Sequence, residues 1–144
     1  MVENYDIAAF IPGDYDEALA LWKRTPGMGI SEADSRARIA DFLLRNRGFS
    51  FAARSSEGGT LVGTVLCGSD SRRGYLYHLA VDEGYRRRGI GTALAERALA
   101  ALKASGVEKC HLMVIAGNES GAAFWRARGW TPREDIELYS KTIA

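Results

Sequence analysis

The sequence lacks the features that mark several large classes of protein. Its two cysteines, Cys67 and Cys110, form no C-x-x-C pair and show no Cys/His ligand spacing, so we expect no zinc site and reduced thiols in a cytoplasmic protein. No apolar run approaches the ~20 residues that cross a bilayer, and the first residues lack the basic and apolar regions of a signal peptide. Its 19 basic and 18 acidic residues give a net charge of +1, which argues against nucleic-acid or membrane binding through bulk charge.

The composition is typical of a globular protein that folds around its own hydrophobic core. Apolar residues make up 47% of the 144 positions, enough to bury a core without disulfides or metal. Nothing repeats and nothing is low in complexity. A chain of this length fits one domain, and we expect residues 1–144 to form it.

The first part of the chain is predicted to be a strand followed by two helices. The run "NYDIAAFI" is typical of a strand, and the turn Pro12-Gly13-Asp14 leads into a helix from Asp14 to Arg24. After the loop "TPGMGIS", Ser31 is predicted to cap a second helix that ends at about Asn46, with Ile39 turned inward.

From residue 49 onward the hydrophobic period changes. Three short runs rich in β-branched and aromatic residues, with turns between them, predict an antiparallel meander over residues 49–82. A helix from Ile90 to Ser105, a strand over 109–116 and a helix from Glu119 to Arg128 follow, and residues 129–143 are expected to supply one or two more strands. The fold class is therefore α/β with a mixed, mostly antiparallel central sheet of six to seven strands and about four helices on its faces.

The stretch "VDEGYRRRGIGTALAERAL" places three arginines before Gly89-Ile90-Gly91 at a helix entrance. A phosphate loop would need G-x-x-x-x-G-K-[ST], and a dinucleotide fold would need a third glycine where Leu94 stands. A helix N-terminus nevertheless has unpaired amides and the positive end of its dipole, and glycines let the backbone approach an anion. A basic run at a solvated surface is the plainer alternative.

Two motifs together favour an anion site of a particular kind. The pattern Arg86-x-x-Gly89-x-Gly91 after the strand "YHLAV" resembles the acyl-CoA motif of the GCN5-related N-acetyltransferases, and "NESGAAFWRARGW", from Asn118, resembles that family's later segment. The resemblance implies direct transfer of an acetyl group from acetyl-CoA to a primary amine in a ternary complex, without metal. It also implies cofactor contacts at Leu79, Ala80 and Val81 (pantetheine and acetyl carbonyl), at Arg86, Arg87, Arg88, Gly89, Ile90, Gly91 and Thr92 (pyrophosphate), and at Asn118, Phe124 and Trp125 (the cofactor arm and sulfur).

The catalytic residues are less clearly indicated. The acid/base positions of similar proteins fall at Tyr75 and Tyr77, and we assign the catalytic role to Tyr77, although a phenol pKa of ~10 makes a poor base. Strand alternation turns His78 to the opposite face unless a bulge intervenes, and packing under a helix is the expected role for it. A glutamate that serves as base in the family would fall at Met113, which cannot accept a proton.

Trp125 departs from the family where a tyrosine would protonate the departing thiolate. An indole N–H cannot give up its proton near neutral pH, so either the thiolate leaves unprotonated, or water or another side chain such as Tyr139 protonates it. We expect the first, with Trp125 as a packing wall. These departures keep an alternative function open, a non-catalytic acyl-CoA-binding or sensor module on the same fold. The expected partner is a small-molecule or peptide amine rather than nucleic acid or membrane, and an exposed terminal strand could pair across a homodimer.

Overall fold

A computed structural model describes residues 4–144 of the chain. The chain forms two compact units, the first ending at Met113 and the second spanning Val114–Ala144. Among the described residues, no helix combines the length and the apolar character needed to cross a membrane.

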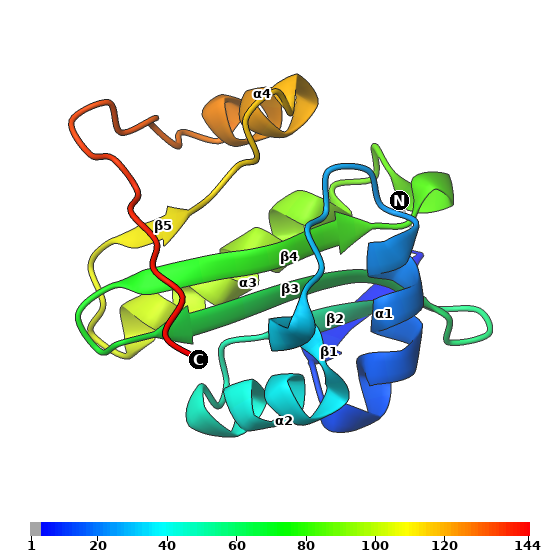
Figure 1. Cartoon of the computed structure of the whole chain (residues 1–144). Helices are drawn as coiled ribbons and strands as arrows, with labels where there is room; N and C mark the ends of the chain where they lie inside the picture. The colour runs from blue at the N-terminus through cyan, green and yellow to red at the C-terminus, as the bar shows by residue number, and fades with distance from the viewer. Residues whose placement is uncertain (1–3) are drawn as a thin grey trace. The chain divides into compact units, whose positions relative to one another are not determined.

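The first unit is built on one mixed sheet (Figure 1). Its strands lie side by side in chain order; the first four are antiparallel, as the predicted meander requires, and the fifth runs parallel to the fourth. The fold class is confirmed, but the strand number was overestimated, because the described chain forms no strand after Leu112. The strands are β1 (Tyr5–Ala9), β2 (Phe51–Ser55), β3 (Leu61–Ser69), β4 (Gly74–Val81) and β5 (Cys110–Leu112).

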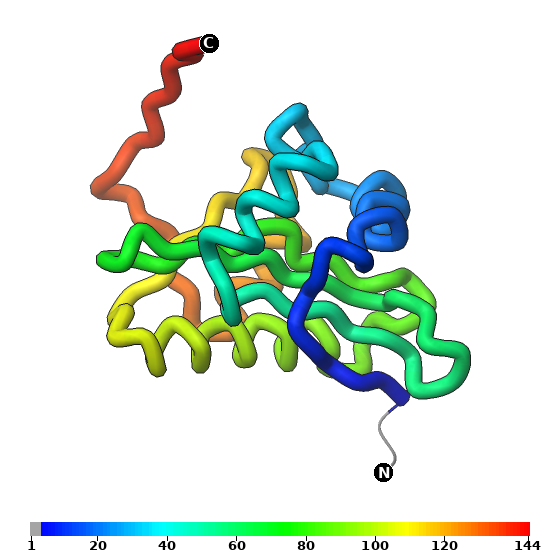
Figure 2. The backbone as a smooth tube through the Cα atoms, turned by 90° about the horizontal axis from the view of Figure 1, so that it is seen from below, coloured from blue at the N-terminus to red at the C-terminus, as the bar shows by residue number. Residues whose placement is uncertain are grey.

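Helices cover both faces of this sheet. Figure 2 shows the first two helices on one face and the long third helix on the other. The fourth helix belongs to the second unit. The helices are α1 (Tyr15–Lys23), α2 (Arg36–Arg45), α3 (Ile90–Ala104) and α4 (Glu119–Ala127), with single 3₁₀ turns η1 (Pro12–Asp14), η2 (Glu32–Asp34) and η3 (Glu83–Tyr85).

The second helix begins later than the sequence predicts. Ser31 does act as a cap, but of the 3₁₀ turn η2, where its hydroxyl accepts a hydrogen bond from the Ala33 amide. Ser35 then adopts an extended conformation and caps α2 by accepting from the Arg38 amide. Two serines four residues apart can each begin a helix, and the sequence alone identified only the first.

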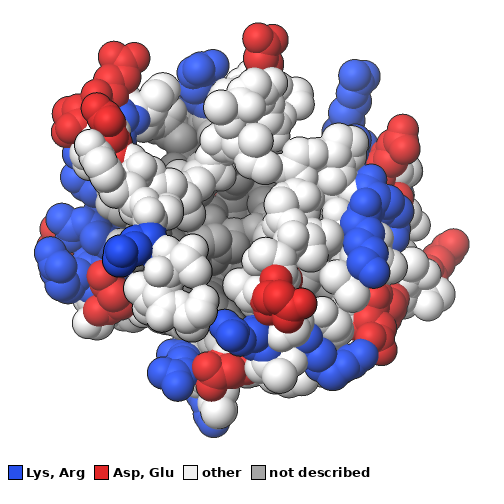
Figure 3. All heavy atoms as spheres, in the orientation of Figure 1, with Lys and Arg blue, Asp and Glu red and all other residues white. Residues whose placement is uncertain are grey.

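Charged side chains of both signs lie on the surface of the protein. Figure 3 shows lysine, arginine, aspartate and glutamate side chains interspersed on one face of the molecule, without a continuous band of either sign. This arrangement agrees with the balanced composition. In the first unit, Arg54 is paired with the buried Asp14 at 2.7 Å and with Glu17 at 3.0 Å, so some of these charges fasten β2 to α1 and the turn before it.

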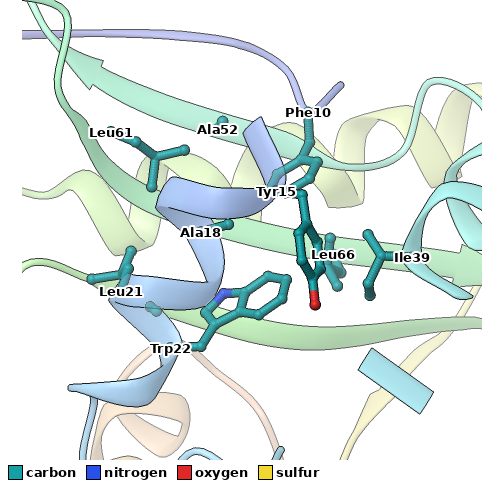
Figure 4. Close-up of a cluster of buried hydrophobic side chains, with 10 residues drawn as sticks. Phe10, Tyr15, Ala18, Leu21, Trp22, Ile39, Ala52, Leu61 and Leu66 are labelled. Atoms are coloured by element: carbon teal, nitrogen blue, oxygen red, sulfur yellow. The ribbon is translucent and has the colours of Figure 1, made fainter. Parts of the chain in front are cut away.

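The larger core lies between the sheet and the helices α1 and α2. Trp22, which is fully buried, stacks on Phe10 with ring centroids 6.3 Å apart and meets Tyr15 edge-on at 6.4 Å. Figure 4 shows these rings with the aliphatic side chains around them. The buried cluster consists of Phe10, Tyr15, Ala18, Leu21, Trp22, Ile39, Ala52, Leu61, Leu66 and Ala80.

Helix α3 lies very close to the opposite face of the sheet. Its buried residues include Ile90, Leu94, Ala98 and Leu102, the four-residue spacing that the sequence predicts. A side chain at Gly63 on β3 would place its Cβ 3.0 Å from Leu94 Cδ1, and one at Gly74 on β4 would collide with Leu102. The two glycines therefore allow the helix to approach the strands.

Candidate active site

Strand β4 contains a bulge between Tyr77 and Ala80. Leu66 pairs with Tyr77, while Thr64, two residues earlier on β3, pairs with Ala80, three residues later on β4. Strand β4 thus has one residue more than β3 in this stretch, which defines a β-bulge. His78, inside the bulge, has a positive φ of 47°, which is uncommon for a residue with a side chain.

The bulge places two neighbouring side chains on the same face of the sheet. The Tyr77 ring lies edge-on to Phe42 of α2 at 6.0 Å, and the His78 ring lies 4.6 Å from Trp22 of α1. In a regular strand, His78 would face α3 instead. The bulge thus meets the exception under which His78 leaves the face given by regular alternation, and its packing under a helix is confirmed.

Asp34 is a site residue that the sequence did not single out. Its Oδ1 lies 2.8 Å from His78 Nε2, and each of the two side chains is 13% exposed. Asp34 is in η2, 44 positions before His78, so its approach depends on the tertiary fold. Its only local signal is its place three residues after Ser31, where an aspartate also serves the cap.

Tyr77, the predicted catalytic residue, is 37% exposed at the edge of this group. Burial, above all, raises the pKa of its phenol, and the neighbouring Tyr75 acts in the same direction. A raised pKa keeps the phenol protonated at neutral pH. Tyr77 is therefore better suited to donating a hydrogen bond than to removing a proton, and its catalytic role stays a prediction.

A fixed turn joins β4 to α3. Asp82 Oδ1 accepts a hydrogen bond from the Gly84 amide at 3.0 Å, and its Oδ2 accepts one from Arg24 at 2.8 Å. The Arg24 hydrogen bond is the main reason that the pKa of Asp82 lies below its usual value. Arg86 Nε donates to the carbonyl of Val81 at 3.2 Å, which ties the first arginine of the run back to the end of β4.

The rest of the arginine run has a backbone suited to anions. Arg87 and Gly89 have positive φ values of 65° and 78°, while Arg88 between them does not. Alternation of this kind turns successive amides toward a common point, as in anion-binding nests. The Arg88 guanidinium lies 4.8 Å above the Tyr85 ring, and a Cβ on Gly89 would meet nothing within 4 Å, so the backbone there borders open space.

Helix α3 begins directly after this turn. Gly89 is its N-cap residue and has no side chain with which to cap the helix. The first amides of a helix, here those of Ile90 and Gly91, have no acceptor within the helix, and the helix dipole is positive at this end. The predicted pyrophosphate residues 86–92 are thus brought together in one short segment that can hold a phosphorylated ligand.

The second unit contains the other predicted contact residues. Asn118 is the N-cap of α4, and its Oδ1 accepts a hydrogen bond from the Gly121 amide at 3.0 Å. Within residues 4–144, the Nδ2 group of Asn118 donates to no protein acceptor. Asn118 therefore combines a capping acceptor with an amide group that can donate to a ligand.

Trp125 lies within a small aromatic cluster of the second unit. Its ring meets Phe124 edge-on at 5.0 Å and Trp130 at 5.2 Å. The Arg128 guanidinium lies 3.7 Å from the centre of the Phe124 ring, and one of its nitrogens donates to the Phe124 carbonyl. One face of Phe124 is thus covered by Arg128, while Trp125 is held between two other rings, as a packing role requires.

Similarity to known proteins identifies the family. Residues 15–130 match the family described as the Acetyltransferase (GNAT) family, and the chain belongs to this family. The protein named "Acetyltransferase SG1711" from Sodalis glossinidius is 28% identical over 138 residues, covering 96% of this chain and 95% of that protein.

Solved structures agree with this assignment at the level of the fold. Ard1 from Thermoplasma volcanium superimposes with a TM-score of 0.78 at 20% identity, covering 90% of this chain and 84% of that one. The PaiA N-acetyltransferase from Thermoplasma acidophilum, solved in complex with coenzyme A, superimposes with a TM-score of 0.75 at 20% identity, covering 90% and 91% of the two chains. The mixed sheet and its helices therefore have the arrangement found in known acetyltransferases.

Proposed function

We propose that the protein is an N-acetyltransferase that transfers the acetyl group of acetyl-CoA to a primary amine. The observation that carries the proposal is the continuous path from the bulge in β4, through the arginine turn, to the N-terminus of α3. Family membership and the names of the relatives support acetyl transfer, and the coenzyme A in the PaiA structure supports an acyl-CoA donor. The two free cysteines are compatible with a reducing cytoplasm.

The residues present fit this donor. The amides of residues 87–92 and the guanidinium groups before them suit a pyrophosphate, since a cap side chain is absent at Gly89 and space is open above it. In the proposal, the backbone of Leu79, Ala80 and Val81 holds the pantetheine arm and polarises the acetyl carbonyl, and Asn118 donates to the arm. Positioning and polarisation then supply most of the rate enhancement.

A test uses the release of free thiol from acetyl-CoA. We expect release to require both the protein and an amine, from a panel of spermidine, L-lysine, a peptide with an amino-terminal alanine, and kanamycin. Mass spectrometry should find the product heavier by one acetyl group. Binding of acetyl-CoA by calorimetry, with no turnover on any amine, would contradict the proposal.

That second result would favour the alternative, a non-catalytic acyl-CoA-binding module. Two observations make the alternative specific: Trp125 stands where the resemblance predicts a phenol, and Met113, just beyond the end of β5, stands where it predicts a carboxylate. Under this alternative, acetyl-CoA should raise the melting temperature of the protein, while amines change neither the melting temperature nor the thiol concentration.

A further inference from the structure

The pair formed by His78 and Asp34 has the geometry of a proton acceptor with its orienting carboxylate. We propose that His78, oriented by Asp34, removes the proton from the acceptor amine during acetyl transfer. The proposal rests on the proposed function, because it assigns the base that this function needs. His78 would then serve as the general base, a role for which Met113 is chemically unsuited.

The carboxylate of the pair is itself held in place. Asp34 Oδ1 lies 2.8 Å from His78 Nε2, and Asp34 Oδ2 accepts a hydrogen bond from the Ser31 amide at 3.0 Å. The Tyr15 hydroxyl donates to the Asp34 carbonyl at 2.7 Å, which fastens the same residue to α1. Both oxygens and the backbone of Asp34 are thus engaged, and the carboxylate can fix the orientation of the imidazole ring.

This contact determines which nitrogen of His78 can act. An ionised carboxylate only accepts hydrogen bonds, so Nε2 carries the hydrogen, and in the neutral ring the lone pair is on Nδ1. Within residues 4–144, Nδ1 has no protein hydrogen-bond partner, and no buried side-chain nitrogen or oxygen lacks one. It follows that Nδ1 keeps some exposed surface, and in the proposal the acceptor amine approaches this nitrogen.

The backbone keeps His78 at this place at an energetic cost. A φ of 47° is unfavourable for an L-residue other than glycine, and such strain persists only where surrounding contacts impose it. Here the Thr64 hydroxyl donates to the His78 carbonyl at 2.8 Å, and Trp22 packs on the ring. The strained residue directly precedes Leu79, where the proposed function places the acetyl carbonyl.

The reaction step balances without any further reagent. The lone pair of the neutral amine attacks the thioester carbon, a C–N bond forms, and the C–S bond breaks as the thiolate of coenzyme A departs. One proton moves from the amine nitrogen to Nδ1 of His78. The products are the acetylated amine, the thiolate and an imidazolium paired with Asp34, and the imidazolium then releases its proton to water.

Chemical rescue distinguishes this role from a purely structural one. His78→Gly suits the positive φ and leaves a space beside Asp34 and Trp22 that imidazole can enter. With the panel amine that the wild type acetylates fastest, we expect kcat to fall about 10²-fold or more, with acetyl-CoA affinity unchanged. Added imidazole should restore activity in His78→Gly, and Asp34→Asn in the same chain should abolish that rescue.

The chain offers a matched control and a measurement independent of turnover. His111, the only other histidine, lies on β5, and His111→Gln should leave kcat unchanged. When the His78 imidazole is neutral, nitrogen NMR should show its ring hydrogen on Nε2. The proposal would be overturned if His78→Gly had an unchanged kcat, or if imidazole did not restore its lost activity. A hydrogen on Nδ1 of the wild-type ring would also overturn it. Absence of wild-type turnover would instead overturn the proposed function, before any variant is made.

Discussion

The indole of Trp22 donates a hydrogen bond to Thr64 Oγ1 at 2.9 Å, inside the core between α1 and β3. Both side chains are fully buried. The Thr64 hydroxyl in turn donates a hydrogen bond to the His78 carbonyl. One hydroxyl group therefore satisfies a core tryptophan and also stabilises the bulge in β4.

Replacing that hydroxyl with a methyl group should destabilise the fold. Thr64→Val keeps the shape of the side chain but removes the acceptor of the Trp22 N–H and one donor to the His78 carbonyl. Loss of the acceptor of the buried Trp22 N–H should cost roughly 1–3 kcal/mol and loss of the hydrogen bond to the part-buried carbonyl about 1 kcal/mol more. We therefore expect the free energy of unfolding, measured in urea, to fall by about 2–4 kcal/mol. Thr64→Ser keeps the hydroxyl and should lose only about 1 kcal/mol for one methyl group. Equal stability of Thr64→Val and the wild type would show that this hydrogen-bond chain is not important.

Two glycines with nearly equal positive φ values allow the effect on ligand binding to be separated from backbone strain. Gly89 and Gly58 have φ values of 78° and 81°, and a Cβ at either position would meet nothing within 4 Å. Alanine at each should cost a similar ~1–2 kcal/mol of stability. Only Gly89→Ala should also weaken acetyl-CoA binding in calorimetry, by about tenfold or ~1.4 kcal/mol, because its methyl group enters the proposed pyrophosphate site. Equal affinities in the two variants would argue against that site.

Asn118 allows capping and ligand binding to be tested separately. Asn118→Ala removes both groups, so it should lower stability by about 0.5–2 kcal/mol and also raise the KM for acetyl-CoA. Asn118→Ser keeps a capping oxygen but lacks the amide donor, so it should retain stability and still show the raised KM. The pH profile of kcat should be unchanged in both variants. A shifted profile with a normal KM would indicate proton transfer by Asn118 instead.

The replacement of a phenol by Trp125 leads to a mild expected phenotype. If Trp125 serves as packing between Phe124 and Trp130, Trp125→Phe keeps an aromatic ring there, and kcat should fall by no more than about tenfold, or ~1.4 kcal/mol of barrier. Trp130→Phe, in the same cluster, is the matched control. A loss of several orders of magnitude in Trp125→Phe alone, with acetyl-CoA affinity intact, would assign Trp125 a direct part in the chemistry.

Patterns local in sequence predicted most of the fold. The meander and helix α3 followed from short runs with a clear period and distinct turns, because a strand or helix with one buried face repeats its apolar residues regularly. The terminal strands expected over residues 129–143 do not form in the structure. Strand formation depends on a partner edge as well as on composition, and a sequence pattern does not show whether an edge is within reach.

The candidate site likewise contains a part that is local in sequence, which could be predicted, and a part that depends on the tertiary fold, which could not. The turn from Arg86 to Gly91 is continuous in sequence, and its arginines and glycines could be identified there. The pair of His78 and Asp34 could not, because a one-residue bulge reverses the face of His78 and the carboxylate comes from a distant turn. Regular alternation gives the wrong side for any residue beyond an unrecognised bulge.

The two glycines under α3 have a consequence for the length of the acyl group. Gly63 and Gly74 allow the helix to lie against β3 and β4, and Gly63, which faces Ile90 and Leu94, sets how closely the first turns of the helix approach the strand beside the bulge. In an acyl-CoA enzyme, that separation is the span that pantetheine must bridge between its phosphates and the reacting carbon. A bulkier residue at either position would push the helix outward and move the carbonyl of a bound thioester along the strand. Selectivity for short acyl chains over longer ones would thus be adjustable from beneath the helix, by residues that never touch the acyl group.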